Sequence, residues 1–89
     1  MQTAEDVAKW MVAKFDIANY LYQEQVVYEI RILFGEKFVY VNANGNLAIG
    51  KDVLKHFKKL SGEKVVWERG DRAWRRLREH EPYVGRQVD

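Results

Sequence analysis

Hydrophobic residues recur at helical spacing in three stretches of the chain. Within residues 4–15, 24–34 and 51–60, apolar side chains fall three or four positions apart, so that each stretch would present one apolar face. Thr3 and Asp6 stand at the start of the first stretch with the spacing of a variant capping box. The pattern therefore predicts three amphipathic helices.

Runs of aromatic and β-branched residues lie between these helices. Residues 20–22 are predicted to form a short strand after the first helix, and residues 38–41 and 47–49 form two further runs. The pair Asn44-Gly45 lies between the latter two, and both residue types tolerate the positive φ that a two-residue type I′ turn requires. We therefore expect a small β-hairpin inserted between the second and third helices.

The segment 64–77 admits two interpretations. With Gly70-Asp71 at the tip of a hairpin, Trp67 would lie opposite Trp74, a cross-strand aromatic pair that stabilises such an element. A fourth helix that begins at Asp71 is the alternative, and local helix propensity favours it. The hairpin is preferred because the strand-forming run Val-Val-Trp before the turn needs a partner, but the helical alternative stays open.

The order of predicted elements is helix, strand, helix, hairpin, helix, hairpin. The passage from the third helix through a Ser-Gly break to Val-Val-Trp-Glu-Arg-Gly-Asp-Arg resembles the recognition-helix-to-wing passage of winged-helix regulators in bacteria. We therefore predict an α+β, winged-helix-like fold: three helices with a small β-hairpin insertion and a C-terminal β-hairpin wing. The departure from that family is the hairpin at 38–49, where winged helices have a tight turn.

Length and tail composition set the predicted domain bounds. A chain of 89 residues holds a single small core, and we assign residues 1–84 to one winged-helix-like domain. Pro82 interrupts regular structure, and the end of the chain offers little but Val88 for burial. Residues 85–89 are therefore predicted to form a flexible C-terminal tail.

Charge is distributed unevenly along the chain. Residues 1–50 hold four basic and six acidic side chains, whereas residues 51–89 hold eleven basic and seven acidic ones, for a net charge of +2 overall. Four lysines fall on the face of helix 51–60 opposite its apolar side. An excess of basic groups in one half of a chain is typical of proteins that bind an anionic partner.

These basic side chains suggest duplex DNA as a partner, with lysines contacting phosphates and hairpin arginines contacting a groove or the backbone. The candidate nucleic-acid-binding residues are Lys51, Lys55, Lys58, Lys59, Arg69, Arg72, Arg75 and Arg76. The alternative is a protein–protein interaction or adaptor module that binds no nucleic acid, with the charges forming a solvated rim around the hairpin. Whether the chain forms a homo-oligomer stays open.

Residue types that carry catalysis or bind metals are sparse in the sequence. The chain lacks cysteine, and its two histidines, His56 and His80, have no short spacing that would suit a metal. Ser61 lies at a predicted helix end and Thr3 at a helix start, so that neither is expected to be a nucleophile. We therefore predict a protein that is not an enzyme, with no catalytic residue, no cofactor and no metal.

Apolar runs are too short for a membrane span. The longest are stretches such as residues 38–41, against the roughly 20 residues that a membrane-spanning helix needs. The N-terminus is acidic, where a secretory signal would be basic and then apolar. The expected location is therefore the cytoplasm, without membrane contact.

Four blocks of sequence stand out when the chain is taken as a whole. They are Leu21-Tyr22-Gln23-Glu24, residues 38–49, Val65-Val66-Trp67-Glu68-Arg69-Gly70-Asp71 and Gly85-Arg86-Gln87. Together they resemble a bacterial family of small stand-alone proteins that is known only as a domain of unknown function. The resemblance covers nearly the whole chain, and it implies no activity, substrate or binding residue.

Overall fold

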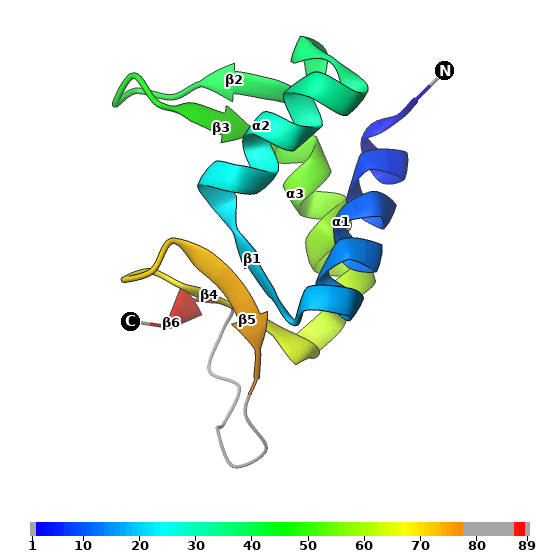
Figure 1. The fold of residues 1–89 in the computed structure, drawn as a ribbon, viewed down its shortest axis with the longest axis vertical. Helices are drawn as coiled ribbons and strands as arrows, with labels where there is room; N and C mark the ends of the chain where they lie inside the picture. Colours follow the sequence, from blue (N-terminus) through cyan, green and yellow to red (C-terminus); the bar gives the residue numbers. More distant parts are fainter. Residues whose placement is uncertain (1, 78–86, 89) are drawn as a thin grey trace.

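Helices and hairpins alternate along the chain in the computed structural model, which describes residues 2–77 and 87–88 (Figure 1). The helices are α1 (Ala4–Ala18), α2 (Gln23–Phe34) and α3 (Lys51–Ser61), with short 3₁₀ turns at Glu36–Phe38 and Gly62–Lys64. The strands are β1 (Tyr20–Tyr22), β2 (Val39–Val41), β3 (Leu47–Ile49), β4 (Val65–Glu68), β5 (Ala73–Arg76) and β6 (Gln87–Val88). The chain thus has the α+β class that its sequence predicts.

The first helix begins at the predicted capping box. The Thr3 hydroxyl accepts a hydrogen bond from the Asp6 N–H at 3.2 Å, and the Asp6 carboxylate accepts one from the Thr3 N–H at 3.0 Å. The bond from the Thr3 N–H lowers the pKa of Asp6 below its ordinary value. α1 ends at Ala18 and not at residue 15, because a left-handed cap at Asn19 (φ 63°), and not the last buried side chain, terminates it.

Four strands of the described residues form one sheet in the order β1-β5-β4-β6, and β2 and β3 form a separate hairpin. β1 lies antiparallel to β5 with Leu21 opposite Trp74, so that the strand between α1 and α2 ties the β4–β5 hairpin to the helices (Figure 1). A second tie joins the Gln23 N–H, at the start of α2, to the Arg72 carbonyl at 3.1 Å. The position of this hairpin relative to the helices is therefore fixed at both its strand and its turn.

The β4–β5 hairpin has the register that its sequence predicts. Trp67 lies opposite Trp74. Residues 73–75 also pair with β1 on their other side, and residues 73–76 form strand β5, which excludes the alternative helix over these residues. At the turn, Arg72 and not a glycine adopts a positive φ (52°), and its N–H donates to the Arg69 carbonyl at 3.3 Å.

The turn of the inserted hairpin differs from the predicted type I′ turn. Of the pair Asn44-Gly45, Gly45 alone has a positive φ (79°), and its N–H donates to the Asn42 carbonyl at 2.9 Å. The Asn42 side chain also accepts from the N–H groups of Asn44 and Asn46, each at 3.0 Å. The loop spans residues 42–46, between the two runs that the sequence predicts as strands, but these bonds and the single positive φ of the pair differ from a type I′ turn.

The core forms where α1 and α3 pack against each other and against the sheet. Every helix and the sheet contribute buried side chains, among them Met11, Ile30, Phe57, Val65 and Trp74. α3 turns Val53 inward as predicted. Leu60, which the sequence places on the same apolar face, is 45% exposed, because it lies in the last turn of α3 at the edge of a surface pocket.

The segment predicted as a flexible tail includes β6. Gln87 and Val88 pair in parallel with Trp67 and Glu68 of β4. Residues 78–86 and 89, which include His80 and Pro82, lie outside the described residues. The tail assignment for 85–89 therefore stays a prediction.

Candidate nucleic-acid interface and the groove beside it

The lysines of α3 form an exposed row along one side of the helix, termed here the basic row. Its members are Lys51, Lys55, Lys58 and Lys59. Val53 and Phe57 occupy the opposite side of α3 and are buried. Because the apolar side anchors the helix in the core, the basic row is held outward without needing any contact of its own.

The inserted hairpin leaves the basic row uncovered. β2 and β3 pack against α2 and project from its upper end in Figure 1. Where the hairpin approaches α3, the Tyr40 ring centre lies 6.0 Å from the Lys51 ammonium, a cation–π contact at the N-terminal end of the row. The departure from a tight turn between α2 and α3 therefore does not block the lysine face.

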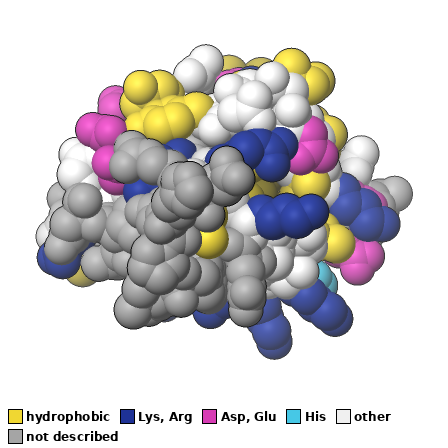
Figure 2. Space-filling model, turned by 90° about the horizontal axis from the view of Figure 1, so that it is seen from below, with side chains coloured by type: hydrophobic (Ala, Val, Ile, Leu, Met, Phe, Trp, Pro, Cys, Tyr) yellow, Lys and Arg dark blue, Asp and Glu magenta, His cyan; other side chains and the backbone are white. Residues whose placement is uncertain are grey.

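Lys and Arg side chains are prominent on the lower face of the molecule. Seen from below, dark blue side chains border hydrophobic surface on the part of this face that the structure describes (Figure 2). α3 ends toward this side of the molecule (Figure 1). Some of the described basic side chains thus lie on the side of the molecule toward which α3 ends.

Two of the candidate hairpin arginines turn toward the protein itself. Arg75 is 8% exposed, and its Nε donates to Glu68 Oε2 at 3.0 Å. Arg76 reaches back to α1, where it lies 3.7 Å from the Asp16 carboxylate and its Nε donates to Asn19 Oδ1. Both guanidinium groups thus have carboxylate partners within the chain, and Arg75 is buried, whereas the Arg76 side chain is 45% exposed. Their assignment to the interface stays a prediction.

The Arg75 ion pair follows from the register of the hairpin. Once Trp67 faces Trp74, Glu68 and Arg75 become diagonal neighbours on the other face of the two strands. Opposite charges at such positions attract, and this signal was present in the sequence. The bond from Arg76 to α1 had no comparable local signal.

Arg69 and Arg72 stay at the exposed tip of the hairpin. Between them, the Asp71 carboxylate accepts a hydrogen bond from the Tyr20 hydroxyl at 2.9 Å. Arg72 also borders a small surface hollow with Tyr22 and other residues at the start of α2. Like the lysines of the basic row, these two arginines are exposed.

A groove that the sequence did not predict lies between α3 and the β4–β5 hairpin. It has a volume of about 540 Å³. Its lining is mostly apolar and aromatic, and it consists of Leu54, Phe57, Trp67, Trp74, Gln23, Lys55 and Lys58. The rings of Trp67 and Trp74 lie 4.8 Å apart, and that of Phe57 meets Trp74 edge-on at 5.5 Å. Two members of the basic row therefore stand on the rim of an aromatic groove.

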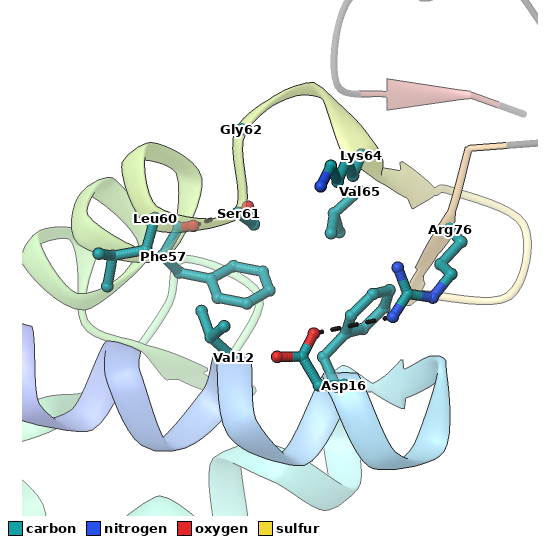
Figure 3. A pocket seen from close by; sticks show the side chains of 10 residues that line it. Val12, Asp16, Phe57, Leu60, Ser61, Gly62, Lys64, Val65 and Arg76 are labelled. Atoms are coloured by element: carbon teal, nitrogen blue, oxygen red, sulfur yellow. Dashed lines mark hydrogen bonds and ion pairs between the residues drawn. The ribbon is translucent and has the colours of Figure 1, made fainter.

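A second hollow, of about 410 Å³, separates the C-terminal parts of α1 and α3 from the start of β4 (Figure 3). The Phe57 ring points into it, and the Asp16–Arg76 ion pair closes one side. Ser61, the sole serine of the chain, donates its hydroxyl to the Phe57 carbonyl at 2.7 Å. The Ser61 hydroxyl thus bonds to the last turns of α3, and the Asp16–Arg76 ion pair joins β5 to α1.

The Tyr20–Asp71 contact gives a prediction about alkaline pH. The hydrogen bond to Asp71 raises the pKa of Tyr20 from 10.0 to about 12. The contact therefore stabilises the fold fully below pH 10, and this contribution is lost as pH rises through the raised pKa. In an ultraviolet titration of tyrosinate, one group is expected to ionise late, and in Asp71→Ala it should ionise nearer to its ordinary pKa. An unchanged curve in Asp71→Ala would contradict the contact, and Tyr20→Phe identifies the signal.

Residues 2–77 and 87–88 contain no cluster of acidic and histidine side chains that could hold a metal ion. Among the same residues, no helix has both the length and the apolar character to cross a bilayer.

The chain belongs to a family of unknown function: the model described as "Family of unknown function (DUF6953)" matches residues 3–76. None of the curated proteins and none of the solved structures matches it. The matched span runs from the capping box to the end of β5 and so contains the basic row, the hairpin and the groove. Membership confirms the resemblance to a family of unknown function over residues 3–76, and it assigns no function.

Proposed function

We propose that the chain is a winged-helix-like module that binds duplex DNA through the basic row of α3 and the tip of the β4–β5 hairpin, and that it is not an enzyme. The observation that carries the proposal is the exposure of all four lysines on one side of α3. The β4–β5 hairpin directly follows this helix, as a wing follows the recognition helix in winged-helix proteins.

The side-chain types favour contacts with phosphates over contacts with bases. The exposed basic groups of α3 are lysines, which bind phosphate as point charges and lack the planar fork with which arginine reads guanine. Arg69 and Arg72 at the hairpin tip are the groups of the interface that could enter a groove. Binding is therefore expected to be strongly salt-dependent and weakly dependent on sequence.

Fluorescence anisotropy with a labelled random duplex tests the proposal. Removal of two phosphate contacts by Lys55→Gln with Lys58→Gln should reduce the log–log salt slope of the affinity by about two. The matched control is Lys9→Gln with Lys37→Gln, which removes the same charge from exposed sites outside the interface and should leave most of the slope intact. Equal effects of the two pairs would mean that net charge alone drives binding.

The hairpin arginines are tested on the same duplex series. If Arg69 or Arg72 reads a base edge, its replacement by glutamine should change the preference between duplexes by about 1–3 kcal/mol, whereas a phosphate contact should weaken all duplexes alike. Absence of any binding at low salt with about 100 µM protein, the weak end of non-specific affinity, would eliminate the DNA proposal.

A protein-interaction module is the second candidate, and the outer face of α2 favours it. Tyr28 and Ile32 lie one turn apart on that face, and Ile32 is 79% exposed. Exposed apolar side chains grouped on one helix face are typical of docking surfaces. Failure of DNA binding would make this face the next one to test, with Ile32→Asp as the variant that should abolish capture of a protein partner.

A further inference from the structure

The groove between α3 and the β4–β5 hairpin has the form of a small-molecule site. Its volume of about 540 Å³ falls within the range of about 300–1,000 Å³ that such sites occupy. Leu54 and Trp67 are half-buried and so offer apolar surface to a ligand, while Phe57 and Trp74 are buried beneath them. Mostly apolar walls with a few polar groups at the edge are the usual composition of a ligand pocket.

The rim of the groove sets the sign of the ligand's charge. Lys55 and Lys58 line it from one side and Gln23 from another. Neither an ion pair nor a hydrogen bond within the described residues occupies the Lys55 ammonium. A neutral apolar ligand would gain no charge-assisted hydrogen bond at this rim, whereas a carboxylate could accept such bonds from lysine ammonium groups.

The floor of the groove sets the shape of the ligand. The indoles of Trp67 and Trp74 are tilted by 56° to each other, with centres 4.8 Å apart. Because Trp74 is buried, the exposed part of the Trp67 indole is the surface that a further ring would meet, and aromatic groups prefer offset and edge-to-face contacts. A simple inorganic anion would contact the lysines of the rim and leave the aromatic surface of the groove exposed to water.

We propose that this groove binds a small planar aromatic carboxylate, with its ring against Trp67 and its carboxylate at Lys55 and Lys58. The site does not depend on the DNA-binding proposal, because its ring contacts lie in the groove and its anion contacts need no phosphate backbone. If both proposals hold, the ligand and duplex DNA compete, since they share Lys55 and Lys58.

Naphthalene-2-carboxylate is the probe, and naphthalene-2-carboxamide is its uncharged match. The readout is the set of indole N–H signals in a nitrogen–proton correlation spectrum, which contains one signal for each of the three tryptophans. Trp10 is the internal reference because it packs against Phe34, away from the groove. Trp10→Phe assigns its signal. We expect saturable shifts for Trp67 and Trp74 with a dissociation constant below about 1 mM, and little shift for Trp10.

The paired lysine variant tests the charge of the ligand. The carboxylate should bind the unmodified protein about tenfold more tightly than the carboxamide, and Lys55→Gln with Lys58→Gln should remove that difference while leaving the carboxamide affinity unchanged. Lys9 and Lys37 lie outside the groove, so Lys9→Gln with Lys37→Gln should preserve the tenfold difference between carboxylate and carboxamide. Both lysines of the test pair are exposed, so that the fold should survive their replacement.

Three outcomes would overturn the proposal. Absence of saturation for Trp67 and Trp74 would mean that the groove is not a binding site. Equal affinity for carboxylate and carboxamide would reduce the groove to an apolar patch without selectivity for anions. A Trp10 signal that shifts as much as those of Trp67 and Trp74 would indicate that the probe associates with exposed aromatic rings in general. None of these outcomes depends on duplex DNA, so failure of one proposal is distinguishable from failure of the other.

Discussion

Trp74→Ala is expected to lower the free energy of unfolding by about 3–5 kcal/mol, the range for loss of a large buried aromatic side chain. Trp74 is 6% exposed, and its ring packs edge-on against Phe57 of α3 and beside Trp67 of β4. Its backbone pairs with Leu21 of β1. Because this ring joins the sheet to α3, its removal would open a cavity at their junction.

Trp67→Ala is the matched comparison for this prediction. From the sequence we expect the same loss of about 3–5 kcal/mol for Trp67 if its ring is buried. The structure leaves Trp67 half-buried, so that its loss should be smaller, about 1–2 kcal/mol. Urea unfolding followed by far-ultraviolet circular dichroism measures both variants, since the loss of helix reports unfolding in each of them. Equal losses, or a loss under about 1 kcal/mol for Trp74, would contradict the packing described.

Gly50→Ala is expected to destabilise the fold by about 1–3 kcal/mol, because the site has no room for a Cβ atom. A Cβ at Gly50 would lie 2.9 Å from the Phe38 carbonyl oxygen, a backbone atom that cannot rotate away. The same carbonyl accepts the Gly50 N–H at 2.7 Å. Gly50 joins the inserted hairpin to α3, and a shift there would also move the start of the basic row at Lys51.

Gly70→Ala is the control for Gly50→Ala. A Cβ at Gly70 would meet no atom within 4 Å, and the φ of Gly70 is not in the left-handed region. Alanine there restricts the unfolded chain more than the folded one, and should stabilise by up to about 1 kcal/mol. Thermal unfolding of the two variants should therefore show shifts of opposite sign. A melting temperature that falls equally in both would mean that steric contact with Phe38 is not the cause at Gly50.

Local sequence was sufficient for most of the secondary structure. The Thr3–Asp6 capping box, the three helices and the pairing of Trp67 with Trp74 all depend on residues close together in the chain, whose spacing can be read directly. The same locality explains the error in the turn type. The Asn44-Gly45 pair matched a type I′ turn, but the Asn42 side chain, two residues earlier, accepts hydrogen bonds across the loop, and only Gly45 of the pair has a positive φ.

The candidate site was harder to predict from the sequence. Whether a basic side chain can bind a ligand depends on whether it already has a partner within the protein, and such a partner can be distant in the chain. The lysines of α3 could be assigned to an exposed face from helical periodicity alone. The contact between Arg76 and Asp16 could not be predicted in this way, because the two residues come together only when β5 pairs with β1 and so lies beside the end of α1. The aromatic groove likewise exists only where the Trp67–Trp74 face meets Leu54 and Phe57 of α3. Periodicity therefore specified which helix face meets water, whereas long-range packing decided which hairpin arginines have partners within the chain and placed two lysines beside an aromatic surface.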